Sequence, residues 1–151
     1  MKRIGLSFII PNQYDQIFMK LFDKLLNTPS TWKRGNHEEI LINNGEDLFE
    51  DASDILNNKE IQRYFSKKDY YPIFASFSVY FEEEGYPAIE INSLEELLTS
   101  SCDLVISIVD SIEVLVFSKH EYILDEVEKK YNTLNYTNLK YHFDNQKINF
   151  N

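Results

Sequence analysis

Alternating apolar and polar residues along the chain predict several β-strands. Residues 3–10, 71–81 and 138–143 alternate in this way, and the shorter segments 37–43 and 86–91 also predict strands. Successive side chains of a strand point to opposite faces of a sheet. The alternating segments therefore predict strands that bury one face in a core.

Apolar residues at helical spacing predict helices between these strands. The first helix follows Asn12, a good N-cap residue, and runs through Leu25. Residues 28–36 contain Pro and Gly and predict a loop. Residues 46–67 predict a second helix, and it is a weak one because Asn57-Asn58 lies in its middle.

The capping-box sequence S-x-x-E predicts where two further helices begin. It occurs at residues 93–96, before a short helix, and again at 118–121, before a long helix that ends near Leu134. The order strand, helix, strand is thus expected twice, over 86–109 and 113–143, with a hairpin between. This is the βαββαβ order of a ferredoxin-like unit.

The mixture of strands and helices, without a linker, predicts one α+β domain over residues 1–151. We expect a single mixed, largely antiparallel sheet with helices mainly on one face. The ferredoxin-like unit forms its C-terminal half.

The predicted hairpin, CDLVISIVDSIEVLVFSK, raises the question of a catalytic pair. A two-residue turn at Asp110-Ser111 would place Cys102 and His120 on opposite faces of the sheet, whereas a three-residue turn would bring them opposite each other. We expect the two-residue turn, and we expect His120 as the second residue of the following helix. A lone cysteine in such a strand is typically a small apolar core residue, so we interpret Cys102 as buried and unreactive.

Both faces of this hairpin are apolar, which predicts cover on both sides of the sheet. Helices on one face leave the second face in need of a layer. The N-terminal elements could supply it, and so could a homodimer formed through this apolar face or a bound protein.

Charge narrows the range of partners. Fifteen Lys and Arg face twenty-five Asp and Glu, which gives a net charge of −10. Phosphate backbones and anionic lipids repel such a chain, so we expect no nucleic acid and no membrane as partner. The charge serves solubility, and it also suits a basic protein partner.

Two further features favour the cytoplasm. One cysteine cannot form an internal disulfide bond. The apolar run after the N-terminal Met-Lys-Arg ends at Pro11, which is too short for a signal peptide.

Patterns for cofactors, metals and catalysis are missing from the sequence. The four glycines stand apart, so no phosphate-binding loop is predicted, and there is no cysteine pair for zinc. His37 and His142 lack a second histidine at ligand spacing, and the acidic segment 43–54 does not match a calcium-binding loop. We therefore predict no cofactor, no metal site and no catalytic residue.

Three surface clusters are candidates for binding a partner. They are the aromatic and basic cluster in the loop, the acidic tip of a hairpin, and an acidic face of the weak helix: Trp32, Lys33 and Arg34; Glu82, Glu83 and Glu84; Asp47, Glu50, Asp51 and Asp54. Tryptophan and arginine are enriched at the centres of interfaces, and we interpret Trp32 as the anchor. In the alternative interpretation the tryptophan fills the end of the core and the acidic clusters serve solubility.

The opening MKRIGLSFIIPNQY and the hairpin CDLVISIVDSIEVLVFSK resemble an uncharacterised family of short proteins from Bacillus and its relatives. This resemblance implies no assigned function and transfers no site residues. As a small acidic α+β protein, the chain is also similar in style to bacterial immunity proteins, which bind toxins.

We therefore expect a non-catalytic cytoplasmic module that binds or regulates a basic protein, in the manner of an immunity protein. A small enzyme with a dispersed site of histidine and carboxylate groups is the first alternative. A structural subunit of a homo-oligomer is the second.

Overall fold

The fold is built on one antiparallel sheet. The computed structural model describes residues 1–81 and 88–150. The strands follow the order β4-β2-β5-β6-β7-β1-β8, and β3 pairs with β5 as well. The strands are β1 (Arg3–Ile9), β2 (Thr31–Arg34), β3 (Glu39–Ile42), β4 (Ile55–Asn57), β5 (Tyr70–Tyr80), β6 (Leu104–Val109), β7 (Glu113–Ser118) and β8 (Thr137–Phe143). Each pairing in the described residues is antiparallel, which confirms the predicted α+β class.

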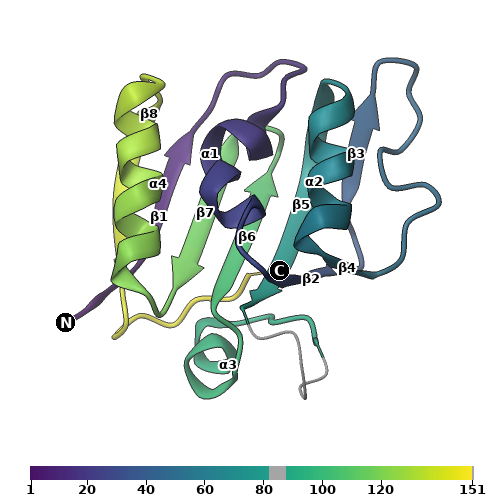
Figure 1. The fold of residues 1–151 in the computed structure, drawn as a ribbon. Helices are drawn as coiled ribbons and strands as arrows, with labels where there is room; N and C mark the ends of the chain where they lie inside the picture. The colour runs from purple at the N-terminus through teal and green to yellow at the C-terminus, as the bar shows by residue number, and fades with distance from the viewer. Residues whose placement is uncertain (82–87, 151) are drawn as a thin grey trace.

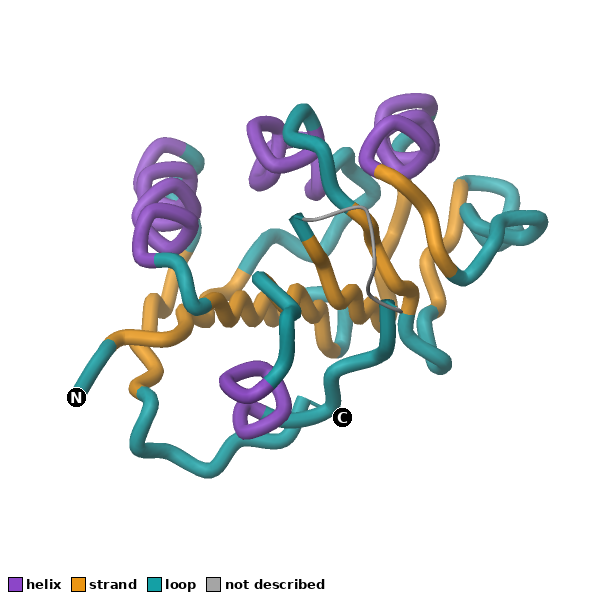
Figure 2. Tube along the Cα trace, turned by 60° about the horizontal axis from the view of Figure 1, so that its bottom comes forward, coloured by secondary structure: helices purple, strands orange, loops and turns teal. Residues whose placement is uncertain are grey.

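Three of the helices cover one face of this sheet. The helices are α1 (Ile17–Leu26), α2 (Asn58–Lys67), α3 (Leu94–Thr99) and α4 (Glu121–Thr133). Figures 1 and 2 show α1, α2 and α4 side by side on the first face, with α3 on the second, so helices lie mainly on one face, as predicted. Aromatic rings dominate the core under α1 and α2. Phe18 stacks on Phe65 with ring centres 4.3 Å apart, and both meet Phe77 of β5 edge-on.

The second face is covered by α3 and the C-terminal segment. Phe150 packs on Phe117 of β7, and the backbone N–H of Leu94 donates to the carbonyl of Ile148 at 2.9 Å. Cys102 belongs to the same buried cluster. We had expected the N-terminal elements or a partner to cover the apolar hairpin here, and instead α3 and the C-terminal segment do so. The reason for expecting a homodimer through this face is thereby removed.

The register of the hairpin differs from the predicted one. Val109 pairs with Glu113, so three residues, 110–112, form the connection, and the two-residue turn was wrong. Asp110 and Ser111 both have positive φ, and the carbonyl of Ile112 accepts from the N–H of Ile10 at 2.8 Å. The carbonyl of Ile112 therefore bonds to Ile10, just after β1, while its N–H donates to the carbonyl of Val109 at 3.3 Å within the hairpin.

The expected strand over residues 86–91 is absent from its described part, residues 88–91. The backbone N–H groups there bond to side chains of β5. Ile89 donates to the hydroxyl of Tyr80 at 3.3 Å, and Ile91 donates to Oγ of Ser78 at 2.9 Å. The ferredoxin-like unit consequently lacks its first strand in the described residues, while the remaining order α3, β6, β7, α4, β8 is as predicted.

Two helices begin later than predicted. α1 begins at Ile17 and not after Asn12, because Asp15 forms a β-bridge with Tyr70. Helix α2 begins at Asn58, and residues 46–57 are not helical. The side chain of Asn57 accepts from the N–H of Glu60, whose carboxylate accepts from the N–H of Asn57 in return. The Asn57-Asn58 pair thus starts the helix that we expected it to weaken.

The start of α4 also differs from the capping box that we predicted at 118–121. His120 is the N-cap residue and makes no capping bond with its side chain. Oγ of Ser118 accepts from the N–H of His120 at 3.0 Å and donates to the carbonyl of Asp103 at 2.7 Å. Ser118 thus joins β7 to the start of β6 and does not cap the helix.

Trp32 lies in a strand and not in a loop. β2 pairs with β4 on one side and β5 on the other, and Trp32 is 0% exposed. Its Nε1–H donates to Oγ of Ser30 at 3.0 Å, and its ring meets Phe77 edge-on at 5.6 Å. The breakers Pro29 and Gly35 bound this short strand, which is why the sequence suggested a loop. The alternative, in which the tryptophan belongs to the core, is the correct one.

We expect Trp32→Ala to lower the free energy of unfolding by about 3–5 kcal/mol, because it leaves a large cavity in the aromatic core. Urea denaturation followed by circular dichroism measures this. Lys33→Ala on the same strand is the matched control and should cost less than about 1 kcal/mol. Equally small losses for both variants would contradict the burial of the indole.

We expect the Cys102 thiol to react slowly with a thiol reagent in the native protein and fast in urea. Burial raises the pKa of Cys102 to about 11, so little of the reactive thiolate exists near neutral pH. A mass shift measured over time reports the labelling. Fast labelling of the native protein at pH 7 would contradict the assignment of Cys102 as a core residue.

Candidate functional site

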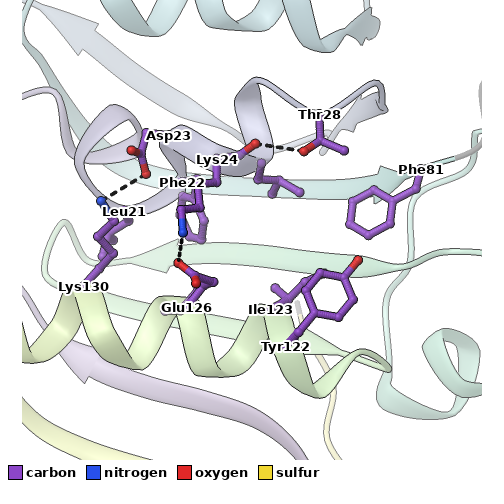
Figure 3. A pocket seen from close by; sticks show the side chains of 12 residues that line it. Leu21, Phe22, Asp23, Lys24, Thr28, Phe81, Tyr122, Ile123, Glu126 and Lys130 are labelled. Carbon is purple, nitrogen blue, oxygen red and sulfur yellow. Dashed lines mark hydrogen bonds and ion pairs between the residues drawn. The ribbon is translucent and has the colours of Figure 1, made fainter.

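An apolar hollow on the first face lies between α1 and α4 (Figure 3). It has a volume of about 300 Å³. We call it the α1–α4 groove, and it is lined by Leu21, Phe22, Asp23, Lys24, Leu25, Thr28, Phe81, Tyr122, Ile123, Glu126, Val127 and Lys130. Pockets of this kind, mostly apolar with a few polar groups, are typical ligand and partner sites.

The pattern of each helix explains this groove. α1 buries Ile17, Phe18 and Leu21 against the sheet, and α4 buries Ile123 and Val127. The backbone of α1 leaves helical geometry at Phe22, which lines the groove. The hollow therefore lies between the apolar face of α1 and the apolar face of α4, where the two helices are neighbours.

Two ion pairs bridge the helices along the groove. Nζ of Lys24 lies 3.1 Å from Oε2 of Glu126, and Nζ of Lys130 lies 3.1 Å from Oδ1 of Asp23 (Figure 3). The neighbouring Lys24 lowers the pKa of Glu126. Exposed pairs of this type contribute little to stability, so a partner can displace them at small cost.

Three aromatic side chains gather at one end of the groove. We call Phe81, His120 and Tyr122 the aromatic mouth. The rings of Phe81 and His120 have centres 5.7 Å apart, and those of His120 and Tyr122 are 5.6 Å apart. Tyr122 is 61% exposed and lines the groove, so its ring is accessible to a partner.

Asp103 holds the aromatic mouth together. Its Oδ1 lies 2.7 Å from Nε2 of His120, and its Oδ2 accepts from the N–H of Phe81 at 2.8 Å. An ionised carboxylate accepts hydrogen bonds only, so Nε2 carries the proton. In neutral His120 the second ring nitrogen, Nδ1, is then an acceptor.

The other two histidines lie elsewhere. His37 is exposed, in the turn before β3. His142 of β8 lies 2.9 Å from Oγ of Ser7 and packs on Phe117, and burial lowers its pKa. The structure therefore brings one histidine, His120, together with one carboxylate and does not gather the three histidines in a pocket.

Lys33 and Arg34 do not form an exposed basic patch with Trp32. Nζ of Lys33 donates to the carbonyl of Arg34 at 2.7 Å. The guanidinium of Arg34 forms an ion pair with the buried Glu38 and lies over the ring of Phe49 at 4.6 Å. Arg34 therefore serves the fold, and the sequence did not reveal its partner Glu38.

The acidic residues of segment 43–54 do not share a helical face. This segment forms turns, and Nη1 of Arg34 holds it by donating to the carbonyls of Ala52 and Ser53. The candidate acidic residues lie along it: Asp47, Glu50, Asp51 and Asp54. Oδ1 of Asp47 accepts from the N–H of Phe49 at 2.8 Å, while the other three are exposed. The acidic tip, Glu82, Glu83 and Glu84, lies outside the described residues.

Sequence reasoning missed the aromatic mouth. Phe81 directly follows β5 and Asp103 directly precedes β6, and the observed pairing of Leu104 with Ser118 brings Asp103 beside His120. The spacing of Tyr122 and Glu126, one helical turn apart in α4, was the one available signal.

The described residues contain neither a metal-binding cluster nor a membrane-spanning helix. Within residues 1–81 and 88–150, no three or more His, Cys, Asp and Glu side chains are grouped so that they could hold a metal ion. In the same part of the chain, the helices are too short or too polar to cross a membrane.

Comparison with known proteins places the chain in a family. An uncharacterized protein of Bacillus subtilis (strain 168), YncE, is 24% identical over 126 residues, which cover 82% of this chain and 80% of the relative. No solved structure matches significantly. The family model described as "Protein of unknown function (DUF2691)" matches residues 3–150. The chain therefore belongs to the DUF2691 family of proteins of unknown function.

Proposed function

We propose that this protein is a non-catalytic cytoplasmic module whose α1–α4 groove binds a segment of a basic protein partner. The observation that carries the proposal is the apolar groove with the exposed Tyr122 at its end. Aromatic side chains that stand in solvent beside an apolar hollow are typical of the central residues of protein interfaces.

The charge of the chain supports a basic partner. The net charge of −10 attracts cationic surfaces over a distance of about a Debye length. On α4, Glu121 lies next to Tyr122 and is exposed, and it shares Arg3 as an ion-pair partner with Asp125. An immunity-type role, in which the module inhibits a basic toxin, is one form that this function would take.

A variant with a blocked groove tests the proposal. Thr28 is exposed and lines the groove, so Thr28→Arg fills it with a long side chain without disturbing the core. We expect a partner captured from the host lysate by the wild type to be captured about tenfold less by Thr28→Arg, the effect of losing about 1.4 kcal/mol. Quantitative mass spectrometry of the captured proteins measures this.

Thr133→Arg is the matched control, because it adds the same charge at the exposed end of α4 and Thr133 does not line the groove. With the purified partner, higher salt should slow association more than it speeds dissociation. Equal capture by Thr28→Arg and the wild type would exclude the groove as the binding site.

A small enzyme is the second candidate, and the Asp103–His120 pair favours it. A carboxylate that orients a histidine can support general-base attack by water on an ester or phosphate. If so, a screen of nitrophenyl esters and phosphates should show turnover that His120→Gln and Asp103→Asn both abolish with unchanged melting temperatures. Turnover that survives both substitutions would exclude this site.

A structural subunit of a homo-oligomer remains a prediction. The apolar sheet face that suggested it is covered by α3 and the C-terminal segment.

A further inference from the structure

We infer that the aromatic mouth of the α1–α4 groove, formed by Phe81, His120 and Tyr122, binds a lysine or arginine side chain of the basic partner, an inference that rests on the proposed function. The apolar groove beyond the mouth holds the methylene stem of that side chain. The binding site is thus specific for a cation with an apolar stem.

The arrangement of the rings is suited to a cation. His120 is in ring contact with both Phe81 and Tyr122, at interplanar angles of 25° and 40°. Figure 3 shows Phe81 and Tyr122 reaching the same end of the groove from two different elements. The faces of phenylalanine and tyrosine rings, such as those of Phe81 and Tyr122, carry negative potential, which attracts ammonium and guanidinium groups.

The charges around the mouth favour a cation over an anion. Among the described residues, no lysine or arginine forms an ion pair with Asp103, whose carboxylate bonds to His120 and to the N–H of Phe81. Glu126 lies one helical turn after Tyr122 and lines the same groove. The carboxylate of Asp103 and the net charge of −10 disfavour an anionic ligand, whereas Glu126 is already paired with Lys24 and Lys129.

The nearby lysines do not occupy the mouth. Lys24 pairs with Glu126 and Lys130 pairs with Asp23, both along the groove. Nζ of Lys119, the residue before His120, donates to the carbonyl of Ser100 at 2.6 Å. The cation that fits the mouth must therefore come from outside the described chain.

The interior of the groove suits the stem of such a side chain. Leu21, Phe22, Ile123 and Val127 line it and are buried. Lysine and arginine bury their methylene groups against apolar surfaces while their charged ends stay near water. Tyr122, at 61% exposure, marks the end that remains in contact with water.

Two fluorescent peptides that differ in one residue test this inference. Both have an apolar sequence around a central position, which is arginine in one and norleucine in the other, and fluorescence anisotropy gives their affinities for the full chain. We expect the arginine peptide to bind about tenfold more tightly, the effect of a desolvated cation–π contact. Tyr122→Ala should abolish this preference and Tyr122→Phe should retain it.

Tyr14→Ala is the matched control, because Tyr14 is a similarly exposed tyrosine, at 42%, that packs on Tyr71 and does not line the groove. It should leave the preference for arginine unchanged. If Tyr122→Ala still prefers the arginine peptide, the preference comes from the net charge of the chain, and the cation site at the aromatic mouth is wrong.

The remaining outcomes separate this inference from the proposed function. Equal binding of both peptides, or binding of neither, overturns the cation site, while capture of a partner that Thr28→Arg reduces still supports the groove. If Thr28→Arg also captures the partner as well as the wild type does, both the cation site and the groove are wrong. Competition by N-acetylarginine amide as strong as that of the arginine peptide would indicate a free small cation as the ligand and overturn the protein source.

Discussion

The central strands of the sheet carry apolar side chains on both faces, and most of the structure follows from the need to cover both. Ile106 and Ile108 of β6 face the core beneath the three helices, whereas Val105 faces the cluster beneath α3. A strand that is buried on both faces is stable only between two layers. The helices α1, α2 and α4 form the first layer, and α3 with the C-terminal segment forms the second.

This two-layer requirement also positions the candidate site. α1 and α4 are distant in sequence, but both must bury an apolar stripe on the same face of the sheet, and they therefore lie side by side. The α1–α4 groove lies between these two helices, is bridged by two ion pairs and is lined at one end by Tyr122.

Asp103 connects the fold to the site. In sequence it lies between β6 and Cys102, which belongs to the buried cluster beneath α3. Its carboxylate bonds to Phe81 after β5 and to His120 at the start of α4, and so connects these two elements. A family of unknown function gives no catalytic assignment to this residue. The geometry of Asp103 suits the positioning of the rings, because one carboxylate oxygen bonds to His120 and the other to the backbone N–H of Phe81.

The sequence by itself determined the α+β class, most strands and the burial of the hairpin, since alternation and helical spacing act over a few residues. It also indicated the end of β5 and the extent of α4 closely. Element boundaries that depend on distant partners were not determined in this way. Asp15 leaves its expected helix to pair with Tyr70, and β2 is a strand because β4 and β5 flank it.

Only the tertiary structure decided which candidate residues are buried and which groups they contact. Trp32, expected as a surface anchor, is buried because neighbouring strands enclose it, and Arg34 is engaged by Glu38 and by the turns of segment 43–54. The aromatic mouth joins Phe81, just after β5, to His120 and Tyr122 at the start of α4. The observed register of the hairpin differs by one residue from the predicted one. Side-chain pairing across strands reverses with each single-residue shift, and local sequence patterns do not fix that register.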